Sequence, residues 1–338
     1  MARVLVTGGA GYIGSVCSAE LLQRGHEVVV VDDLSTGHRD AVPTQARFYD
    51  ADIGDRIAMR RIFSETRVES VFHFAAKALI SESVTNPGVF FERNLAAGIQ
   101  LCEATRESGV KHFVFSSTAA VYGDPSTVPI PEEHPTEPVN AYGESKLGFE
   151  RALRWYASAY GWTVTSFRYF NASGSTEEQG ELHDPETHIL PLLLQVASGR
   201  RVYFEIYGTD YDTPDGTCLR DYVHVSDIAD AHLLALEQPE TPGFHAYNIG
   251  TGTSYSVQQV CSTVAAVTGR KLQLRNAPRR LGDPAVLCAS PAKLISRFGW
   301  RPKRSSLTAI VESAWQWERR QASLAAAVTG AQAQYPQN

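Results

Sequence analysis

The sequence predicts an α/β protein built on a doubly wound parallel sheet of the Rossmann type, followed by a smaller, mixed α/β region. Two patterns in the first half of the chain lead to this prediction. Short apolar stretches alternate with helical stretches, and the apolar stretches are hydrophobic almost throughout, which is typical of parallel strands covered on both faces. A glycine-rich turn also joins the first strand to the first helix, as in dinucleotide-binding βαβ units.

The elements of this first region follow in regular order. RVLVTG and EVVVVDD are predicted strands on either side of the helical stretch SVCSAELLQRG, which makes a strand–helix–strand unit. Further strands are expected at 47–53, 70–76, 112–118 and 163–170, with helices near 56–66, 90–108 and 143–160 between them. This alternation predicts one parallel sheet with helices on both of its faces.

The pattern loosens after Asn171. A loop rich in glycine and acidic residues leads to a helix near 189–198, and the stretches 219–236 and 246–252 again contain strand patterns. We therefore expect one domain over residues 1–172 and a second over 173–338. We also expect elements of 221–250 to pack back onto the first domain.

Composition and charge disfavour several classes of protein. The chain has 338 residues, a net charge of −6 and a pI near 5.9, with no run of Lys and Arg, so a nucleic-acid partner is not expected. No apolar stretch is long enough for a membrane span, and the N-terminus enters a strand pattern rather than a signal peptide. The cysteines and histidines are dispersed, so we expect reduced thiols in a cytoplasmic protein and no metal site.

The turn after the first strand predicts a dinucleotide site. Gly8, Gly11 and Gly14 form G-x-x-G-x-x-G between a strand and a helix, and glycine there allows a pyrophosphate to approach the helix N-terminus. Asp32 ends the next strand, where a carboxylate accepts from ribose hydroxyls and repels a 2′-phosphate, so NAD is favoured over NADP. A role as a helix cap or turn residue is the alternative for Asp32. Ligands bind at the carboxyl ends of parallel strands, so contacts are also expected at Asp52 and Ile53 and at Phe74, Ala75, Ala76, Lys77 and Ala78.

Tyr142 and Lys146 form the candidate catalytic pair, with Thr118 at the end of the fifth strand. The spacing puts Tyr142 and Lys146 on one helix face, although such pairs also occur on ordinary surface helices. Tyrosine has a reference pKa of about 10, and a nearby ammonium lowers this value. Beside a nicotinamide, Tyr142 would then act as a base, while Thr118 would hydrogen-bond the substrate oxygen.

Seven motifs in series extend these observations. The motifs are TGGAGYIG, SSTAAVYG, YGESK, RYFNASG, RDYVHVSDIADAH, YNIGTG and PRRLGDPA, and the likeness that they indicate runs from residue 2 to about 318. In this series the chain resembles the extended short-chain dehydrogenase/reductases, and among them the nucleotide-sugar 4-epimerases. The resemblance implies reversible epimerisation of UDP-glucose and UDP-galactose at carbon 4 through a transient 4-keto sugar, with NAD as internal hydride acceptor and donor.

The resemblance also implies roles for single residues and for the second domain, which it makes the nucleotide-sugar domain. Tyr142 is the implied base and Lys146 the contact to the nicotinamide ribose. The further cofactor contacts that it implies are Tyr12, Ile13, Asp33, Leu34, Ser35, Thr36, Gly37, Asn94 and Phe170, and the nucleotide-sugar contacts are Tyr169, Asn171, His188, Ile189, Arg220, Arg280, Asp283 and Leu287.

The residues themselves support part of the nucleotide-sugar set. Arg220 and Arg280 lie on loops of the less regular region, where guanidinium groups suit a diphosphate. For each arginine the alternative is a salt bridge between elements. Tyr207 could lie against a uracil ring or could pack in the ordinary way.

Relatives with this fold include dehydratases and decarboxylases. Dehydratases carry carboxylates directly after the strand-end Thr, whereas this chain has Ala119 and Ala120 after Thr118, and alanine cannot move protons. Reversible oxidation alone is therefore favoured. The alternatives are another epimerase or dehydrogenase of this family, including one that releases reduced cofactor, and a non-catalytic dinucleotide-binding protein.

The chain departs from the epimerase pattern at four positions. Thr118 stands where Ser is common, and Lys77 lies one place early. His188 replaces an Asn of the sugar pocket, and Leu287 replaces a Tyr that excludes a 2-acetamido group. The larger apolar space predicts measurable action on UDP-N-acetylhexosamines as well, with UDP-glucose still preferred.

A homodimer is also expected. The family pairs two helices of each subunit, and here these are near 90–108 and 143–160. Both helices have more apolar residues than one buried face requires: Phe90, Phe91, Leu95, Ile99 and Leu101 in the first, and Leu147, Phe149, Leu153, Trp155 and Tyr156 in the second.

Overall fold

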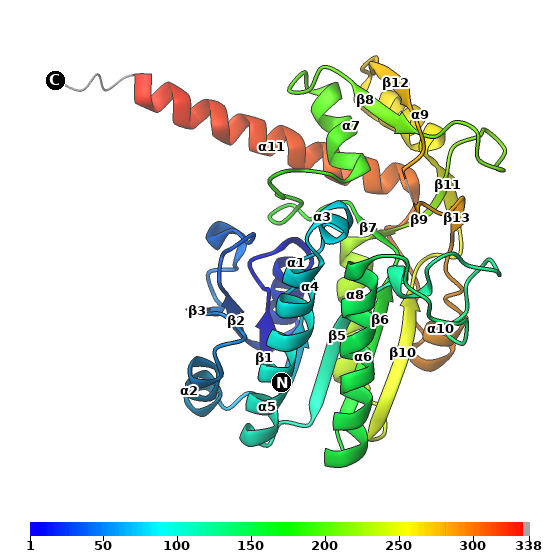
Figure 1. Cartoon of the computed structure of the whole chain (residues 1–338). Helices are drawn as coiled ribbons and strands as arrows, with labels where there is room; N and C mark the ends of the chain where they lie inside the picture. Colours follow the sequence, from blue (N-terminus) through cyan, green and yellow to red (C-terminus); the bar gives the residue numbers. More distant parts are fainter. Residues whose placement is uncertain (281, 334–338) are drawn as a thin grey trace.

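A seven-stranded parallel sheet forms the larger part of the molecule (Figure 1). In this computed structural model, which describes residues 1–280 and 282–333, the strand order is β10-β6-β5-β4-β1-β2-β3. The sheet strands are β1 (Arg3–Thr7), β2 (Glu27–Asp32), β3 (Arg47–Asp50), β4 (Ser70–His73), β5 (His112–Thr118), β6 (Thr163–Tyr169) and β10 (Gly243–Ile249). The predicted doubly wound fold is confirmed.

Helices cover both faces of this sheet because successive strand residues point to opposite sides. Val4 and Val6 of β1 belong to one apolar cluster, and Leu5 between them belongs to the other. The helices of this part are α1 (Tyr12–Gln23), α2 (Arg56–Thr66), α3 (Ile80–Thr85), α4 (Pro87–Phe90), α5 (Ala97–Ser108), α6 (Ala141–Tyr160), α8 (Val225–Glu237) and α10 (Ala292–Phe298), with short turns η1 (Arg39–Ala41), η2 (Phe91–Ala96) and η3 (Ala119–Tyr122).

The smaller part lies beyond the carboxyl ends of the sheet strands (Figure 1). One small sheet joins β11, β9 and β13, with β7 on β9, and a second pairs β12 with β8. The remaining elements are β7 (Asn171–Ser173), α7 (Ile189–Ala197), β8 (Phe204–Tyr207), β9 (Leu219–His224), β11 (Ser254–Ser256), α9 (Val257–Thr268), β12 (Leu274–Ala277), β13 (Val286–Leu287) and α11 (Leu307–Ala333).

The strands predicted within 219–236 and 246–252 belong to different sheets. β10 pairs with β6 in the large sheet, register Ile249 to Tyr169. β9 instead pairs with β7, β11 and β13 in the small sheet, while α8, which follows it directly, packs on α1 of the larger part. The polar residues of LRDYVH and its short partner strands explain this difference, because a central parallel strand is normally apolar throughout.

A buried ion pair ties α6 to the sheet. Glu150 and Arg168 have side chains only 1% and 3% exposed, and Arg168 Nη2 lies 2.8 Å from Glu150 Oε2. Glu150 Oε1 also accepts hydrogen bonds from the Ser117 and Ser166 hydroxyls, at 2.6 and 3.0 Å. The helix that bears the candidate catalytic pair is thereby fixed to β5 and β6.

All five cysteines are buried and unpaired. Among the described residues, none of the helices combines the length and the apolar character that crossing a membrane requires.

Three buried histidines predict a pH-dependent stability. Burial lowers the pKa of His73 to about 3 and the pKa of His224 and His232 to about 4, from 6.5. Between pH 6.5 and about 4 the unfolded chain therefore binds protons that the folded chain does not, so the free energy of unfolding falls as the pH falls. At pH 5 each histidine contributes a loss of roughly 2 kcal/mol.

Denaturant unfolding at pH 7 and pH 5 measures this loss. His73→Phe, in a site lined by Phe113, Phe115 and Phe149, should show a smaller pH dependence than the unmodified protein. Equal free energies of unfolding at the two pH values would contradict the prediction.

Candidate active site

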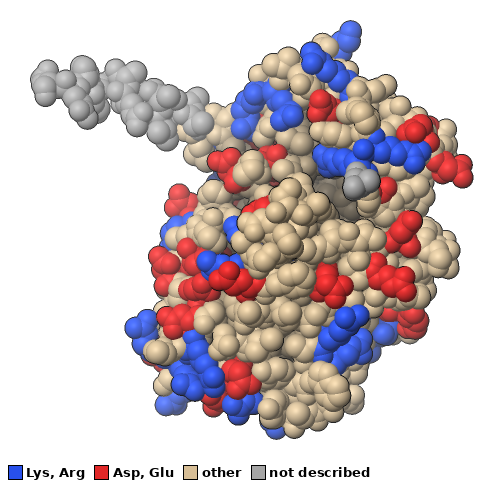
Figure 2. Space-filling view, in the orientation of Figure 1, with Lys and Arg blue, Asp and Glu red and all other residues tan. Residues whose placement is uncertain are grey.

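A cleft of about 920 Å³ runs along the carboxyl ends of the sheet strands and into the smaller part of the molecule. Figure 2 shows Lys and Arg side chains along the upper edge of the hollow between the two parts. Arg220 and Arg280 are among the residues that line the cleft. An elongated ligand with an anionic centre suits this shape and charge.

Most of the predicted site residues line this one cleft. Its lining includes Gly8, Gly11, Tyr12, Ile13, Gly14, Asp32, Asp33, Ser35, Thr36, Gly37, Asp52, Ile53, Phe74, Ala75, Ala76, Lys77, Ala78, Thr118, Tyr142, Lys146, Tyr169, Phe170, Asn171, His188, Ile189, Tyr207, Arg220, Arg280, Asp283 and Leu287.

Leu34 and Asn94 are the two predicted residues outside that lining. The Leu34 N–H donates to Asp32 Oδ1 at 2.9 Å. The Asn94 side chain is buried in η2, where it bonds both the N–H and the C=O of Lys77 and donates to the Ser145 hydroxyl. Asn94 thus holds the 74–78 stretch against α6 from behind the wall of the cleft.

The glycine turn is packed too closely against the chain's own backbone to hold side chains at Gly8 and Gly14. Gly8 has φ +72°, and a Cβ there would lie 2.4 Å from the Ala75 nitrogen, while a Cβ on Gly14 would lie 2.2 Å from the Gly8 carbonyl oxygen. Gly11 caps α1 without a side-chain hydrogen bond, so the first N–H groups of the helix are open to an anion.

Asp32 closes the other side of the same turn. Its Oδ2 accepts from the Ala10 N–H at 2.9 Å and its Oδ1 from the Leu34 N–H. The carboxylate is 8% exposed, and burial raises its pKa, which the two backbone donors partly offset. Together with the open helix end, these features fit a dinucleotide with a free ribose 2′-hydroxyl.

Thr118, Tyr142 and Lys146 come together at the middle of the cleft. In the register of the sheet Thr118, at the end of β5, lies beside Tyr169 of β6, and its hydroxyl accepts from the Ala120 N–H at 3.1 Å. Burial raises the pKa of Tyr142, whereas the Thr118 hydroxyl acts to lower it. The Tyr142 ring meets Phe90 edge-on, with centroids 6.4 Å apart.

Lys146 lies one turn farther along α6. Its Nζ donates to the Ser116 carbonyl at 2.8 Å and lies 4.9 Å from the Phe115 ring centroid. Burial lowers the pKa of Lys146 to about 7, and the charge of Glu150, one more turn along, acts to raise it. The buried Glu150 carboxylate therefore stabilises the ammonium form of Lys146.

The candidate nucleotide-sugar residues include paired side chains. Arg220 is paired with Asp283 by a hydrogen-bonded salt bridge. The Arg280 guanidinium lies 4.0 Å above the Tyr207 ring, whose hydroxyl donates to Glu205 at 2.7 Å. Leu287 packs against a cluster that contains Phe170. Arg220 thus fits both alternatives: it forms a salt bridge between elements, and it also lines the cleft where a diphosphate could bind.

Glu181 and His183 line the cleft but were absent from the predicted site. With His188 they form a group whose ligand atoms all lie within 4.8 Å of one another. The signal in the sequence was E-x-H-x-x-x-x-H at 181–188, in a loop whose course cannot be read from periodicity.

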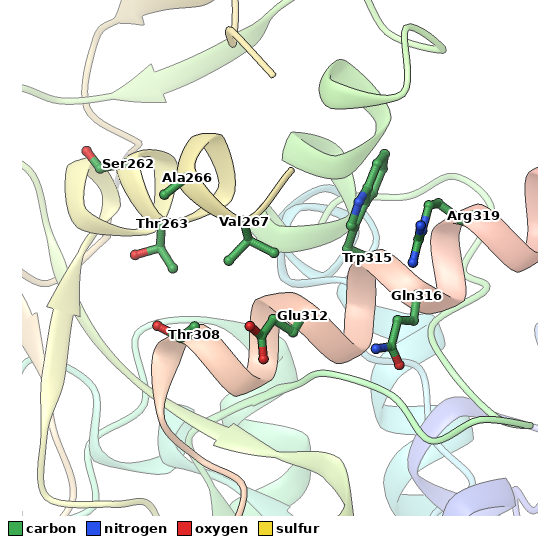
Figure 3. A pocket seen from close by; sticks show the side chains of 9 residues that line it. All are labelled: Ser262, Thr263, Ala266, Val267, Thr308, Glu312, Trp315, Gln316 and Arg319. Carbon is green, nitrogen blue, oxygen red and sulfur yellow. The ribbon is translucent and has the colours of Figure 1, made fainter. Parts of the chain in front are cut away.

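A second hollow, of about 730 Å³, lies on the surface between α9 and α11 (Figure 3). Thr308, Glu312, Trp315 and Arg319 contribute to its lining, and the Arg319 guanidinium lies 5.9 Å from the Trp315 ring centroid. None of its lining residues belongs to the predicted site.

The sequence over residues 4–250 matches the family described as NAD dependent epimerase/dehydratase family. The chain belongs to that family. This match confirms the predicted resemblance, and it confirms NAD as the cofactor of the family.

Individual relatives in this family are similar over nearly their whole length. The UDP-glucose 4-epimerase of Corynebacterium glutamicum is 47% identical over 313 residues, which cover 93% of this chain and 94% of that protein. A crystal structure of UDP-glucose 4-epimerase from Brucella ovis in complex with NAD is 40% identical with a TM-score of 0.89, covering 93% of this chain and 97% of that one. Another UDP-glucose 4-epimerase structure, from Stenotrophomonas maltophila with bound NAD and formylated UDP-arabinopyranose, is 36% identical with a TM-score of 0.92, covering 96% and 100%.

Proposed function

We propose that the protein is an NAD-dependent UDP-glucose 4-epimerase, which interconverts UDP-glucose and UDP-galactose through a transient 4-keto sugar. The observation that carries the proposal is the meeting of Tyr142, Thr118 and Lys146 in a cleft that also contains the glycine turn and Asp32. Full-length similarity to proteins of that name supports the choice of substrate.

The chain's own residues would move the proton. The Tyr142 phenolate accepts the proton of the 4-hydroxyl when the alcohol becomes a ketone, and the same phenol returns it in the reverse step. The Thr118 hydroxyl, which acts to lower the pKa of Tyr142, and the Lys146 ammonium both favour the phenolate over the phenol. When bound, NAD supplies the acceptor and donor of hydride and a positive charge beside this group.

The ribose and pyrophosphate of the cofactor would contact Asp32 and the first turn of α1. We assign Phe74–Ala78, Asp52 and Ile53 to the same cofactor, and Arg220, Arg280, Asn171 and Tyr169 to the nucleotide sugar, since all of these line the cleft. Asn94 acts in this proposal through the 74–78 stretch.

The two domains would divide this work. We assign cofactor binding to residues 1–172 with elements of 221–250, and sugar-nucleotide binding to the rest of 173–338. The parallel pairing of β10 with β6 and the packing of α8 on α1 support this division.

Turnover without added cofactor tests the proposed function. Purified protein with tightly bound NAD should convert UDP-galactose into UDP-glucose with no accumulation of reduced cofactor. Reduced cofactor formed in proportion to substrate would instead indicate a dehydrogenase, and absence of any reaction in protein that contains NAD would overturn the proposal.

We further propose that two chains form a homodimer through the helical segments 90–108 and 143–160, in the cytoplasm. Trp155 is 76% exposed and Phe91 38% exposed, which is unusual for such apolar side chains. The apolar surface available to a partner is smaller than the sequence predicted, because these residues are buried within the chain: Phe90, Leu101, Leu147, Phe149 and Leu153. The cytoplasmic proposal has the support of five buried, unpaired cysteines.

Light scattering should give about twice the chain mass of 37.0 kDa. Trp155→Glu should shift this equilibrium toward single chains because it places a charge in the proposed contact, whereas Val202→Glu, on an exposed residue far from α6, serves as the control. The mass of a single chain at micromolar concentration would contradict the dimer.

From the presence of Leu287 we predict that the protein accepts a broader range of sugars. Leu287 is partly buried beside Phe170, and the His188 ring is directed toward Glu181 and Glu186. We expect measurable epimerisation of UDP-N-acetylglucosamine, with UDP-glucose preferred by about 1–3 kcal/mol in kcat/KM.

The test of this specificity is to measure kcat/KM for both sugars in three proteins: the unmodified protein, Leu287→Tyr and Leu287→Met. Tyrosine should remove most of the N-acetyl activity, while methionine, of similar volume, should leave it. An N-acetyl activity untouched by Leu287→Tyr would show that residue 287 does not control access.

A further inference from the structure

We propose that Glu181, His183 and His188 form a binding site for a divalent transition-metal ion of the zinc class, within the cleft. This site is additional to the epimerase function. Two imidazole nitrogens and one carboxylate oxygen are the ligand set that zinc and its neighbours prefer, whereas magnesium and calcium prefer oxygen alone.

The geometry of the three side chains supports such a site. His183 Nδ1 hydrogen-bonds Glu181 Oε1, His188 Nδ1 lies 3.7 Å from Glu181 Oε2, and the two imidazole ring centroids are 5.3 Å apart. The three ligand atoms lie within 4.8 Å of one another. Tetrahedral bonds of about 2.0–2.2 Å place ligand atoms roughly 3.3–3.6 Å apart, so a pair at the 4.8 Å limit would have to close by roughly 1.2–1.5 Å.

The carboxylates are held in place independently of the histidine rings. Glu181 Oε1 accepts from the Leu182 and His183 N–H groups, at 2.9 and 3.1 Å. Glu186 Oε1, which pairs with His188 Nδ1 at 2.9 Å, also accepts from the Thr187 and His188 N–H groups, each at 2.6 Å. Each imidazole can therefore exchange its Nδ1 proton for a metal while both carboxylates keep their backbone donors.

Two carboxylates beside these rings create a demand for positive charge. The Glu181 and Glu186 side chains are only 10% and 8% exposed, whereas those of His183 and His188 are 28% and 48% exposed. Both carboxylates approach His188 Nδ1, and buried carboxylates require a compensating cation. The more open histidines give an ion access from the cleft.

The segment that carries these ligands is attached to both sides of the cofactor region. The Tyr12 hydroxyl donates to the Gly174 carbonyl at 2.5 Å, His38 Nε2 hydrogen-bonds the Leu182 carbonyl at 2.9 Å, and Trp317 Nε1 donates to the Glu181 carbonyl at 3.1 Å. A metal that joins Glu181 to His188 would link this segment to the start of α7. We infer a structural ion that stabilises the segment over the cleft, with its open position facing the cleft.

Metal binding can be measured directly on the full chain without a histidine tag. After removal of metals with a chelator, calorimetry with Zn²⁺ should give one site per chain, Co²⁺ should give visible absorption of a tetrahedral or five-coordinate complex, and Mg²⁺ should give neither. Bound Zn²⁺ should raise the thermal unfolding midpoint.

His183→Gln removes one ligand while keeping a polar side chain, and His188→Gln does the same for another. Each should weaken Zn²⁺ binding at least about tenfold. The control is His134→Gln, because His134 is partly buried outside the 181–188 segment and hydrogen-bonds Ser126; it should bind Zn²⁺ as the unmodified protein does. Circular dichroism shows whether each variant is folded.

Three results would overturn the proposal: no Zn²⁺ binding by the folded chain, unchanged binding in both folded ligand variants, or equal loss in His134→Gln. The readouts do not involve UDP-sugar turnover. A failure of the metal proposal is therefore separate from a failure of the proposed epimerase function.

Discussion

Tyr142→Phe should abolish nearly all epimerase turnover while leaving NAD binding largely intact. Phenylalanine keeps the ring and its edge-on contact with Phe90 but removes the oxygen that would take the 4-hydroxyl proton. Loss of a general base typically lowers the rate 10²–10⁴-fold, so we expect a loss of kcat of at least roughly a hundredfold. Steady-state kinetics and the NAD content of the purified variant measure the two quantities.

Tyr160→Phe is the matched control, since Tyr160 ends the same helix and its side chain is exposed. It should retain the activity of the unmodified protein. A Tyr142→Phe variant with more than about a tenth of the original turnover would contradict the assignment of the base.

Arg168→Met should cause a large loss of stability. It leaves Glu150 buried without its cation, although the Ser117 and Ser166 hydroxyls still donate. Removing one partner of a buried ion pair costs about 3–5 kcal/mol. The free energy of unfolding from denaturant titration measures this loss.

Two comparisons separate the buried pair from ion pairs in general. Arg24→Met removes a surface pair with Asp230, whose side chains are 36% and 21% exposed, and should cost at most about 1 kcal/mol. The double variant Arg168→Met with Glu150→Met should recover part of the loss, because no unpaired charge remains buried. A loss in Arg168→Met as small as in Arg24→Met would contradict this account.

The large sheet could be predicted from the sequence because its strands are apolar and regularly spaced. β1, β2, β5 and β6 lie where their patterns placed them, and the carboxyl ends of parallel strands meet at one edge. Gly8, Asp32, Thr118 and Tyr142 therefore fall in one cleft without any knowledge of the loops.

Other features could not be predicted from the sequence, for physical reasons. Asn94 lies in a π-helical turn, η2, whose i→i+5 bonds rotate side chains away from the ordinary helical face, so spacing could not show its contacts with Lys77 and Ser145. β9 pairs in the small sheet, where short polar strands carry no strong pattern. Glu181, His183 and His188 meet only because long-range hydrogen bonds fold an irregular loop.

For the apolar residues of α6 as well, the sequence pattern could not predict which side chains are buried. The sequence pattern predicted that α6 has more apolar residues than one buried helix face requires, among them Leu147, Phe149, Leu153 and Trp155. Three of these are buried in the chain and only Trp155 is largely exposed. A helix between a sheet and the segment η2 buries two faces. The number of apolar residues therefore overstated the surface left for a partner.

Transfer of a hydrogen label at carbon 4 tests the central claim most directly. UDP-galactose with deuterium at carbon 4 is converted by the purified protein, and the product is analysed by mass spectrometry and NMR. An enzyme that removes and returns hydride within one closed cleft, with Tyr142 handling only the hydroxyl proton, predicts UDP-glucose with the deuterium still at carbon 4. Product in which solvent hydrogen has replaced the deuterium, or deuterium recovered in released reduced cofactor, would contradict the account.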